Sequence, residues 1–105
     1  KGGLPGAINA TVQAGANPGE IDLTWGDNSA VGSASADDPS LILLYNPDKL
    51  ESVFTTAGPT RSTGAYTVIV PDSFTGDSLE AYIAFWAVDG TAVSNSTYIG
   101  SVVTP

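Results

Sequence analysis

The residue types best suited to chemistry gather in one acidic segment, residues 26–39 (GDNSAVGSASADDP). Asp27, Asp37 and Asp38 supply carboxylates there, and Asn28 adds an amide oxygen. Ca²⁺ takes about six to eight oxygen ligands, often from a flexible segment, so the three aspartates form a candidate calcium site. The spacing does not fit an EF-hand. Because Asp and Asn also begin turns that Gly and Ser complete, the alternative interpretation is an ordinary solvated loop.

Catalytic chemistry is limited by the composition of the chain. It contains no histidine and no cysteine, which removes the usual base of a catalytic triad, the thiolate nucleophile and the imidazole metal ligand. A Ser–Lys pair would depend on Lys1 or Lys49, and both lie in terminal or turn sequence. Paired carboxylates for glycoside hydrolysis must flank a cleft, and a domain of this size has little cleft to offer. The sequence therefore predicts a protein that is not an enzyme, with no catalytic residues.

Charge and composition narrow the range of partners. Eleven acidic residues against three basic ones give a net charge of -8, which repels nucleic acid phosphates and anionic lipid. No apolar run approaches the ~20 residues that a membrane-spanning helix needs. Charged residues make up 13% of the chain, about half the share in ordinary soluble domains. We expect no nucleic acid partner and no membrane insertion, but a surface suited to close contact with neighbouring proteins.

The length predicts a single domain over residues 1–105, which is enough to bury a core without disulfides or a metal. The chain begins at Lys1 and contains no methionine. We therefore expect it to be a processed or excised C-terminal part of a longer protein.

Hydrophobic patterning predicts strands throughout. Residues 20–25 alternate, with Ile21, Leu23 and Trp25 on one face, which is typical of a half-buried strand. Residues 41–45 (LILLY) are apolar at every position, which predicts a central strand covered on both faces. Further strands are expected at residues 7–14, 50–56 and 65–70, and two more in a hairpin within residues 79–103.

The hairpin is predicted by Asp89-Gly90, which lies between two β-rich runs, because Gly accepts the positive φ of a tight reversal. Seven short strands with no helical period favour an all-β fold, a seven-stranded antiparallel β-sandwich. The residues expected in its core are Ile21, Leu23, Trp25, Leu43, Val68, Ile83 and Phe85.

Several segments resemble known families. LTW at residues 23–25, YTV at 66–68 and AVDG at 87–90 are similar to patterns of fibronectin type III domains, which implies an immunoglobulin-like sandwich. KGGLPGA, LTWGDNSAVGSASADD, LLYNP, TRSTG, GDSLEAYIAF and DGTAVSNSTYIGSV resemble the C-terminal half of a Bacteroidota family catalogued as domain of unknown function 6266. That family has a further N-terminal region and no assigned activity. The resemblance therefore implies domain boundaries and a fold class, and it transfers no catalytic residue.

Residues 81–88 are apolar on both strand faces, although only one face can cover the sandwich's own core. The fibronectin-like corner points Ile83 and Phe85 inward, which leaves Tyr82, Trp86 and Val88 outward as candidate partner-binding residues. A shift of one residue would exchange the two sets, so the opposite assignment is the alternative.

Two classes of function follow. In the first, the domain is a non-enzymatic structural module, a self-assembling subunit or decoration of a surface appendage, filament or virion. Its partners would be other copies of itself or a neighbouring structural protein, and its location would be extracellular, on a cell surface or on a virion. In the second, it is a carbohydrate-binding module in which Tyr82 and Trp86 form a stacking platform beside Asn95 and Thr97.

Overall fold

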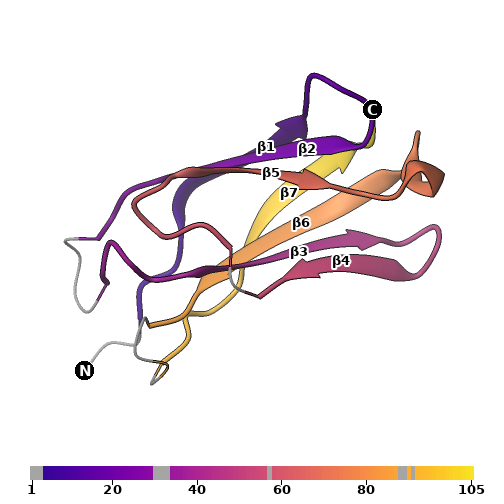
Figure 1. Ribbon diagram of the computed structural model, residues 1–105. Coiled ribbons are helices and arrows are strands. Elements are labelled where there is room, and N and C mark those ends of the chain that lie inside the picture. Colours follow the sequence, from indigo (N-terminus) through magenta and orange to yellow (C-terminus); the bar gives the residue numbers. More distant parts are fainter. Residues whose placement is uncertain (1–3, 30–33, 57, 88–89, 91) are drawn as a thin grey trace.

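The protein is a β-sandwich of two antiparallel sheets, as the sequence predicts. The computed structural model describes residues 4–29, 34–56, 58–87, 90 and 92–105 (Figure 1). The three-stranded sheet contains β1 (Ile8–Ala14), β2 (Glu20–Gly26) and β5 (Ala65–Ile69), in the order β1-β2-β5. The four-stranded sheet has the order β4-β3-β6-β7, with β4 (Glu51–Thr55), β3 (Ser40–Asn46), β6 (Ser78–Phe85) and β7 (Thr97–Val103).

The core lies between the sheets and follows from period-2 alternation. Ile21, Leu23 and Trp25 of β2 point inward, whereas Glu20 and Asp22 remain partly exposed. Six of the seven predicted core residues are buried, and the inward set is completed from β5 and β6 by Val68, Ile83 and Phe85. The Trp25 and Phe85 rings meet edge to face, with centroids 5.9 Å apart, so the two sheets are joined by an aromatic contact.

The predicted burial of Leu43 is wrong. Ile42 and Leu44 are the inward residues of β3, whereas Leu41 and Leu43 lie on the outer face and are only partly buried. β3 is central, because it pairs with β4 on one side and β6 on the other. Among the described residues no further layer covers its outer side, so the apolar run from Leu41 to Tyr45 reflects an apolar outer surface and not burial on both faces.

The connection from β5 to β6 adds to the core. A single 3₁₀ turn, η1 (Asp72–Phe74), follows Pro71, and it places the Phe74 side chain in the interior. Thr75 and Asp77 continue the turn through main-chain bonds to Asp72 and Phe74, at 3.1 Å and 2.8 Å. A segment predicted only as a connection therefore closes one end of the sandwich.

The β6–β7 hairpin pairs as predicted, but its ladder is interrupted. A bridge between Trp86 and Val93 continues the two strands, and Ala87 N–H donates to the Ala92 carbonyl at 2.8 Å. Gly90 has φ 78°, the left-handed conformation that a tight reversal requires. Asp89, the other half of the predicted turn, and Val88 lie outside the described residues.

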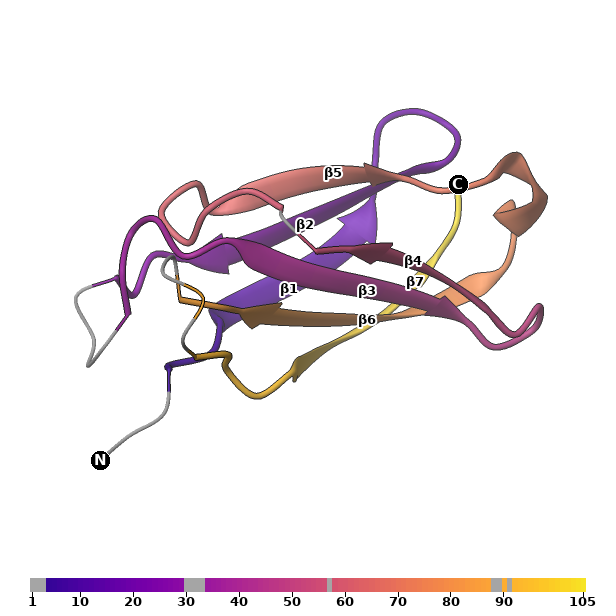
Figure 2. The same cartoon turned by 60° about the horizontal axis from the view of Figure 1, so that its bottom comes forward.

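One long side of the sandwich is closed and the other is open. β1 packs against β7 across the two sheets, so the first and last strands lie together. β5 and β4 form the sheet edges on the opposite side, as the second view shows (Figure 2). Within the described residues, no helix is long and apolar enough to cross a membrane.

Candidate docking surface on the four-stranded sheet

The outer side of the four-stranded sheet carries a continuous group of apolar side chains. Because Ile83 and Phe85 point into the core, Tyr82 and Trp86, which flank them in the alternating strand, face outward, as the fibronectin-like alignment predicts. The alternative register is therefore excluded. We call the following residues the outer apolar face: Leu41, Leu43, Phe54, Tyr82, Trp86 and Tyr98.

A band of these side chains crosses all four strands. Leu43 of β3 is in register with Phe54 of β4 and with Tyr82 of β6, and Tyr82 pairs with Tyr98 of β7. The two tyrosine rings are 5.2 Å apart and tilted by 52°. Phe54 and Tyr98 are 59% and 54% exposed, so the band protrudes most at its two ends.

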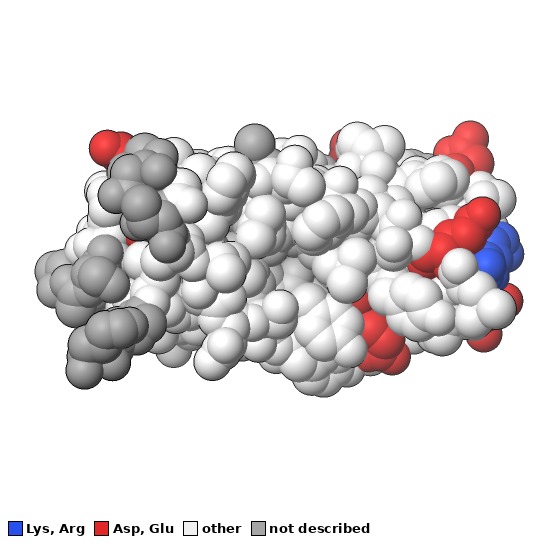
Figure 3. Space-filling model, turned by 90° about the horizontal axis from the view of Figure 1, so that it is seen from below, with Lys and Arg blue, Asp and Glu red and all other residues white. Residues whose placement is uncertain are grey.

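The band is uncharged, although an acid lies beside it. The Tyr98 hydroxyl donates a hydrogen bond to Glu80 Oε1, and this bond raises the pKa of Tyr98. Tyr98 therefore remains neutral at physiological pH. Most of the charged side chains visible on this side of the molecule gather near the end at which β3 turns into β4, and a broad uncharged area covers the sheet (Figure 3).

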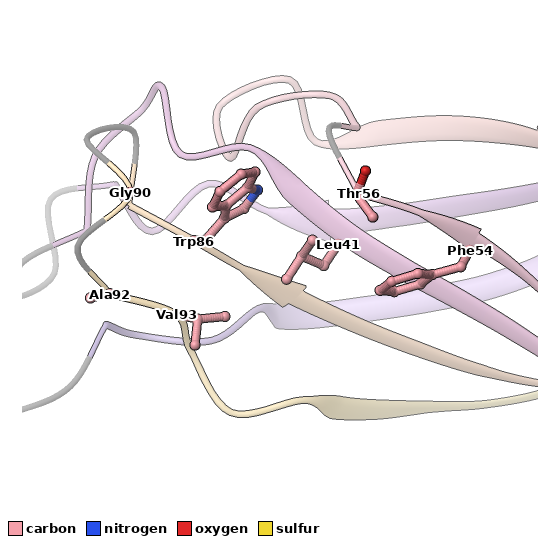
Figure 4. Close-up of a pocket in the computed structure, with 7 residues that line it drawn as sticks. All are labelled: Leu41, Phe54, Thr56, Trp86, Gly90, Ala92 and Val93. Atoms are coloured by element: carbon pink, nitrogen blue, oxygen red, sulfur yellow. The ribbon is translucent and has the colours of Figure 1, made fainter.

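Two grooves flank Phe54. One has a volume of about 480 Å³ and is lined by Leu41, Trp86 and Val93, with Leu41 lying between Trp86 and Phe54 (Figure 4). The other, of about 430 Å³, is lined by residues that include Leu43 and Tyr82. Phe54 and Leu41 line both grooves, so the face has a ridge with a hollow on each side.

The Trp86 indole nitrogen is buried, and no acceptor for its N–H lies among the described residues. A buried donor without an acceptor costs about 1–3 kcal/mol. The apolar surface of the Trp86 ring thus lines the first groove, while its N–H group is buried and makes no hydrogen bond to a described residue.

The opposite sheet has a mainly polar outer surface, with Ile69 of β5 as its exposed apolar side chain. Thr11 and Thr24 share a hydrogen bond across β1 and β2, and the Thr67 hydroxyl donates to Asp22 Oδ1 at 2.7 Å. Glu20 extends this polar set along β2. The two outer faces of the sandwich therefore differ in character, and among the residues that the structure describes only those of the four-stranded sheet form an aromatic band.

The other residues considered for carbohydrate contact do not all join this face. Asn95 is exposed in the segment before β7. Thr97 is in register with the buried Ile83, and its hydroxyl would lie 3.2 Å from a Cβ placed on Gly6, so it points away from the aromatic band. Ser96 lines the second groove and takes the place that the sequence interpretation gave to Thr97.

The three aspartates proposed for calcium are not brought together as a metal site. Asp38 is buried and forms an ion pair with Arg61 at 2.9 Å. Asp27 is exposed, and the Ser29 side chain, followed by its main-chain amide, lowers the pKa of the Asp27 carboxyl. Asp37 is exposed as well. In the part of the chain that the structure describes, no three His, Cys, Asp or Glu side chains gather closely enough to hold a metal ion.

Arg61 lies in the segment between β4 and β5, and it is fully buried. Its Nε and Nη2 atoms donate to Asp38 Oδ2 at 3.0 Å and 2.9 Å, and its Nη1 atom donates to Asn28 Oδ1 at 2.8 Å. Nη2 also donates to the Pro5 carbonyl at 2.9 Å, while the guanidinium carbon lies 4.3 Å from the centre of the Phe85 ring.

Gly6 completes this arrangement, because its carbonyl accepts hydrogen bonds from Asn28 Nδ2 at 3.0 Å and from Arg61 Nη1 at 3.4 Å. We call Arg61, Asp38, Asn28 and the carbonyls of Pro5 and Gly6 the Arg61 cluster. It joins the start of the chain to the two loops that follow β2 and precede β5. The available signal in the sequence was that Arg61 is the only arginine of the chain.

Comparison with known proteins gives one match. A family model described as a family of unknown function, DUF6266, matches residues 1–100. The chain belongs to the DUF6266 family. It matches no curated protein and no solved structure.

The DUF6266 match covers both features described above. The outer apolar face and the Arg61 cluster lie entirely within the matched residues 1–100. Membership in DUF6266, a family of unknown function, assigns no reaction, ligand or partner to the chain.

Proposed function

We propose that this domain is a non-enzymatic structural module that docks through its outer apolar face. The partners would be other copies of the chain or a neighbouring structural protein in a surface appendage, filament or virion. The observation that carries the proposal is the contrast between the two sheets: one outer surface has an uncharged aromatic band, whereas the other is mainly polar.

The size and composition of the face suit a protein interface. The molecule measures 42 Å by 25 Å in its two longer directions, an outline of about 1,000 Å², which leaves room for a standard interface that buries about 800 Å² per partner. Tyr, Trp and Phe are enriched at the centres of such interfaces. Trp86 is already partly buried, so the larger gain would come from Phe54 and Tyr98, which are 59% and 54% exposed. Covering a side chain of this size contributes at most about 1.5–3 kcal/mol before the entropy of association is subtracted.

The ion pairs favour a non-enzymatic role. Asp38, the most buried acid of the predicted calcium set, is held by Arg61, and Lys49 is paired with Asp77 at 2.9 Å. A carboxylate or an amine with its partner already in place is a poor general base or nucleophile. This supports a binding surface as the functional part of the domain.

The strand order can be compared with that of fibronectin type III domains. The arrangement of three strands (β1-β2-β5) against four (β4-β3-β6-β7) agrees with the fibronectin type III-like resemblance of the sequence. We include an immunoglobulin-like ancestry and an extracellular, cell-surface or virion location in the proposal, because sandwiches of this kind are common in cell-surface proteins.

Carbohydrate binding is the second candidate. The groove beside Trp86 supports it, because an indole ring that lines an apolar hollow offers a surface on which a sugar ring can stack. Tyr82 and Ser96 line the neighbouring groove.

The experiment compares the association of the intact protein with that of two serine variants by sedimentation velocity across protein and salt concentration. Phe54→Ser removes an exposed side chain of the outer apolar face. Leu50→Ser, the matched control, removes one that is 78% exposed in the turn beyond β3. Phe54→Ser should weaken association about 10–100-fold, since about 1.4 kcal/mol corresponds to tenfold, and Leu50→Ser should not.

Salt should strengthen association, because the net charge of -8 repels like copies at low ionic strength. If the intact protein stays monomeric at high concentration and moderate salt, self-assembly fails. Tryptophan quenching by polysaccharides, lost in Trp86→Ser, would then favour the carbohydrate function.

A further inference from the structure

The fold has four sheet-edge strands, and three of them carry features that discourage pairing with another chain. β1 contains a register shift between Ile8 and Thr11 and packs against β7. β7 contains a bulge, because Ile99 is an extra residue between Tyr98 and Gly100, which pair with the consecutive residues Tyr82 and Ala81 of β6. β4 begins with the charged Glu51. Bulges and charges of this kind are how proteins protect exposed edges.

β5 has none of these features. Its residues, Ala65 to Ile69 (AYTVI), include no charge and no proline, and its pairing with β2 runs without a register shift. Ile69 is 65% exposed. β5 is therefore an open, uncharged edge on a protein whose overall charge is -8.

The hydrogen bonds at the ends of β5 show which main-chain groups face outward. Trp25 N–H donates to the Gly64 carbonyl at 2.9 Å, and Val70 N–H donates to the Gly19 carbonyl at 2.9 Å. In an antiparallel ladder the residues bonded to one neighbour alternate with those that turn away. The even-numbered residues thus bond to β2, and Ala65, Thr67 and Ile69 direct their N–H and C=O groups to the free edge.

We propose that β5 pairs with β5 of a second copy, antiparallel and centred on Thr67. The two three-stranded sheets would then form one continuous six-stranded sheet, in the order β1-β2-β5-β5-β2-β1. In this register Thr67 opposes Thr67, and Ile69 opposes Ala65. All three pairs are of the hydrogen-bonded type, because these are the residues whose main-chain groups point outward.

A second copy fits this edge better than an arbitrary strand, because the register is self-complementary. The bulky Ile69 side chain meets the small Ala65 side chain twice, once on each side of the central pair. Thr–Thr pairs across strands are also favourable. No charged side chain of β5 has to be desolvated.

The pairing goes beyond the proposed function and does not rest on it. A symmetric interface between two copies closes at a dimer, so the outer apolar face alone, used symmetrically, cannot extend an assembly. A second symmetric interface on another part of the surface allows propagation. The β5 edge lies on the three-stranded sheet, separate from the outer apolar face.

The test uses Phe54→Ser as the background, so that the outer apolar face does not contribute. Thr67→Pro removes the outward N–H, which the β2–β5 ladder does not use, and the extended Tyr66 before it tolerates proline. Thr67→Val is the matched control, since it keeps the N–H. Sedimentation should show dimers in the background and in Thr67→Val, and dimerisation at least about tenfold weaker in Thr67→Pro.

Hydrogen exchange on the intact protein gives a second measurement that needs no variant at residue 67. The amides of Ala65, Thr67 and Ile69 should become protected as protein concentration rises, and Ile69→Lys should abolish this protection while keeping every amide. If these three amides exchange at a rate independent of concentration, the β5 pairing is wrong, whatever Phe54→Ser does. If they become protected while Phe54→Ser leaves association unchanged, the pairing holds and docking through the outer face fails.

Discussion

Removing the Arg61 guanidinium should be among the most damaging single changes to this fold. Arg61→Met keeps most of the apolar stem but leaves the Asp38 carboxylate, which is 1% exposed, without its cation. Breaking a buried pair in this way costs about 3–5 kcal/mol. The Pro5 and Gly6 carbonyls lose donors as well, so the upper part of that range is expected.

The loss is large against the total stability of a small domain, which is about 5–15 kcal/mol. The assay is urea unfolding followed by tryptophan fluorescence, with Lys49→Met as the matched control. The Lys49–Asp77 pair has the same 2.9 Å separation, but Lys49 is 36% exposed. Exposed pairs contribute about 0–1 kcal/mol, so the control should unfold close to the intact protein.

A second variant separates charge burial from packing. In Arg61→Met/Asp38→Leu both charges are absent, and replacing a buried pair with apolar side chains is often neutral. The double variant should therefore recover much of the stability lost in Arg61→Met. If Arg61→Met costs no more than Lys49→Met, the reasoning from the buried pair is refuted.

The remaining predictions concern the core and pH. Leu23→Ala should cost about 2–5 kcal/mol in chemical denaturation, because Leu23 is fully buried, whereas Leu43→Ala on the outer face should cost clearly less; equal losses would contradict the assigned faces of β3. The hydrogen bond from Asn46, followed by that from Lys49, lowers the pKa of Asp77. As pH falls, Asp77 is therefore protonated in the unfolded chain before it is protonated in the folded protein. The stability that Asp77 contributes is fully present at pH values above the ordinary pKa of an aspartate, and it is lost as pH falls through the lowered pKa of the folded state. Asp77→Asn should flatten the acid side of the pH–stability curve, and an unchanged slope would show that Asp77 does not contribute.

The sequence predicts the strands of the fold well, because most of them have one solvent-exposed face and one buried face. The alternation of residues 20–25 reports directly which side chains enter the core. The run from Leu41 to Tyr45 is apolar at every position, so its pattern does not show which side chains point into the core. Leu43 was therefore assigned to the wrong face. Tyr82 and Trp86 face outward, as the fibronectin-like corner predicted, because they alternate along the strand with the buried Ile83 and Phe85.

The Arg61 cluster could not be predicted in the same way. The residues around Arg61 are typical of a turn, and an arginine side chain in a turn is usually exposed to solvent. Its partners are distant along the chain: Pro5 is 56 residues away, Asn28 is 33 and Asp38 is 23. Only the packing of loops from both sheets brings these groups to one place.

The positions of Pro5 and Pro105 determine how the domain would respond to tension. Pro5 is bound near the end of β2, through Arg61, whereas the Pro105 carbonyl accepts a hydrogen bond from Gly19, just before β2 begins. A pull between these two residues runs along the strands. Ladder hydrogen bonds lie across the strands, so such a load shears many of them at once and does not unzip them one by one.

The Arg61 cluster is the first part of the domain to bear this load. Force applied at Pro5 reaches the Arg61 guanidinium before it reaches β1. The charged hydrogen bonds of the cluster would have to yield before the first strand is strained. A sandwich connected in this way resists extension along its long axis, a mechanical property that the proposed structural role would use.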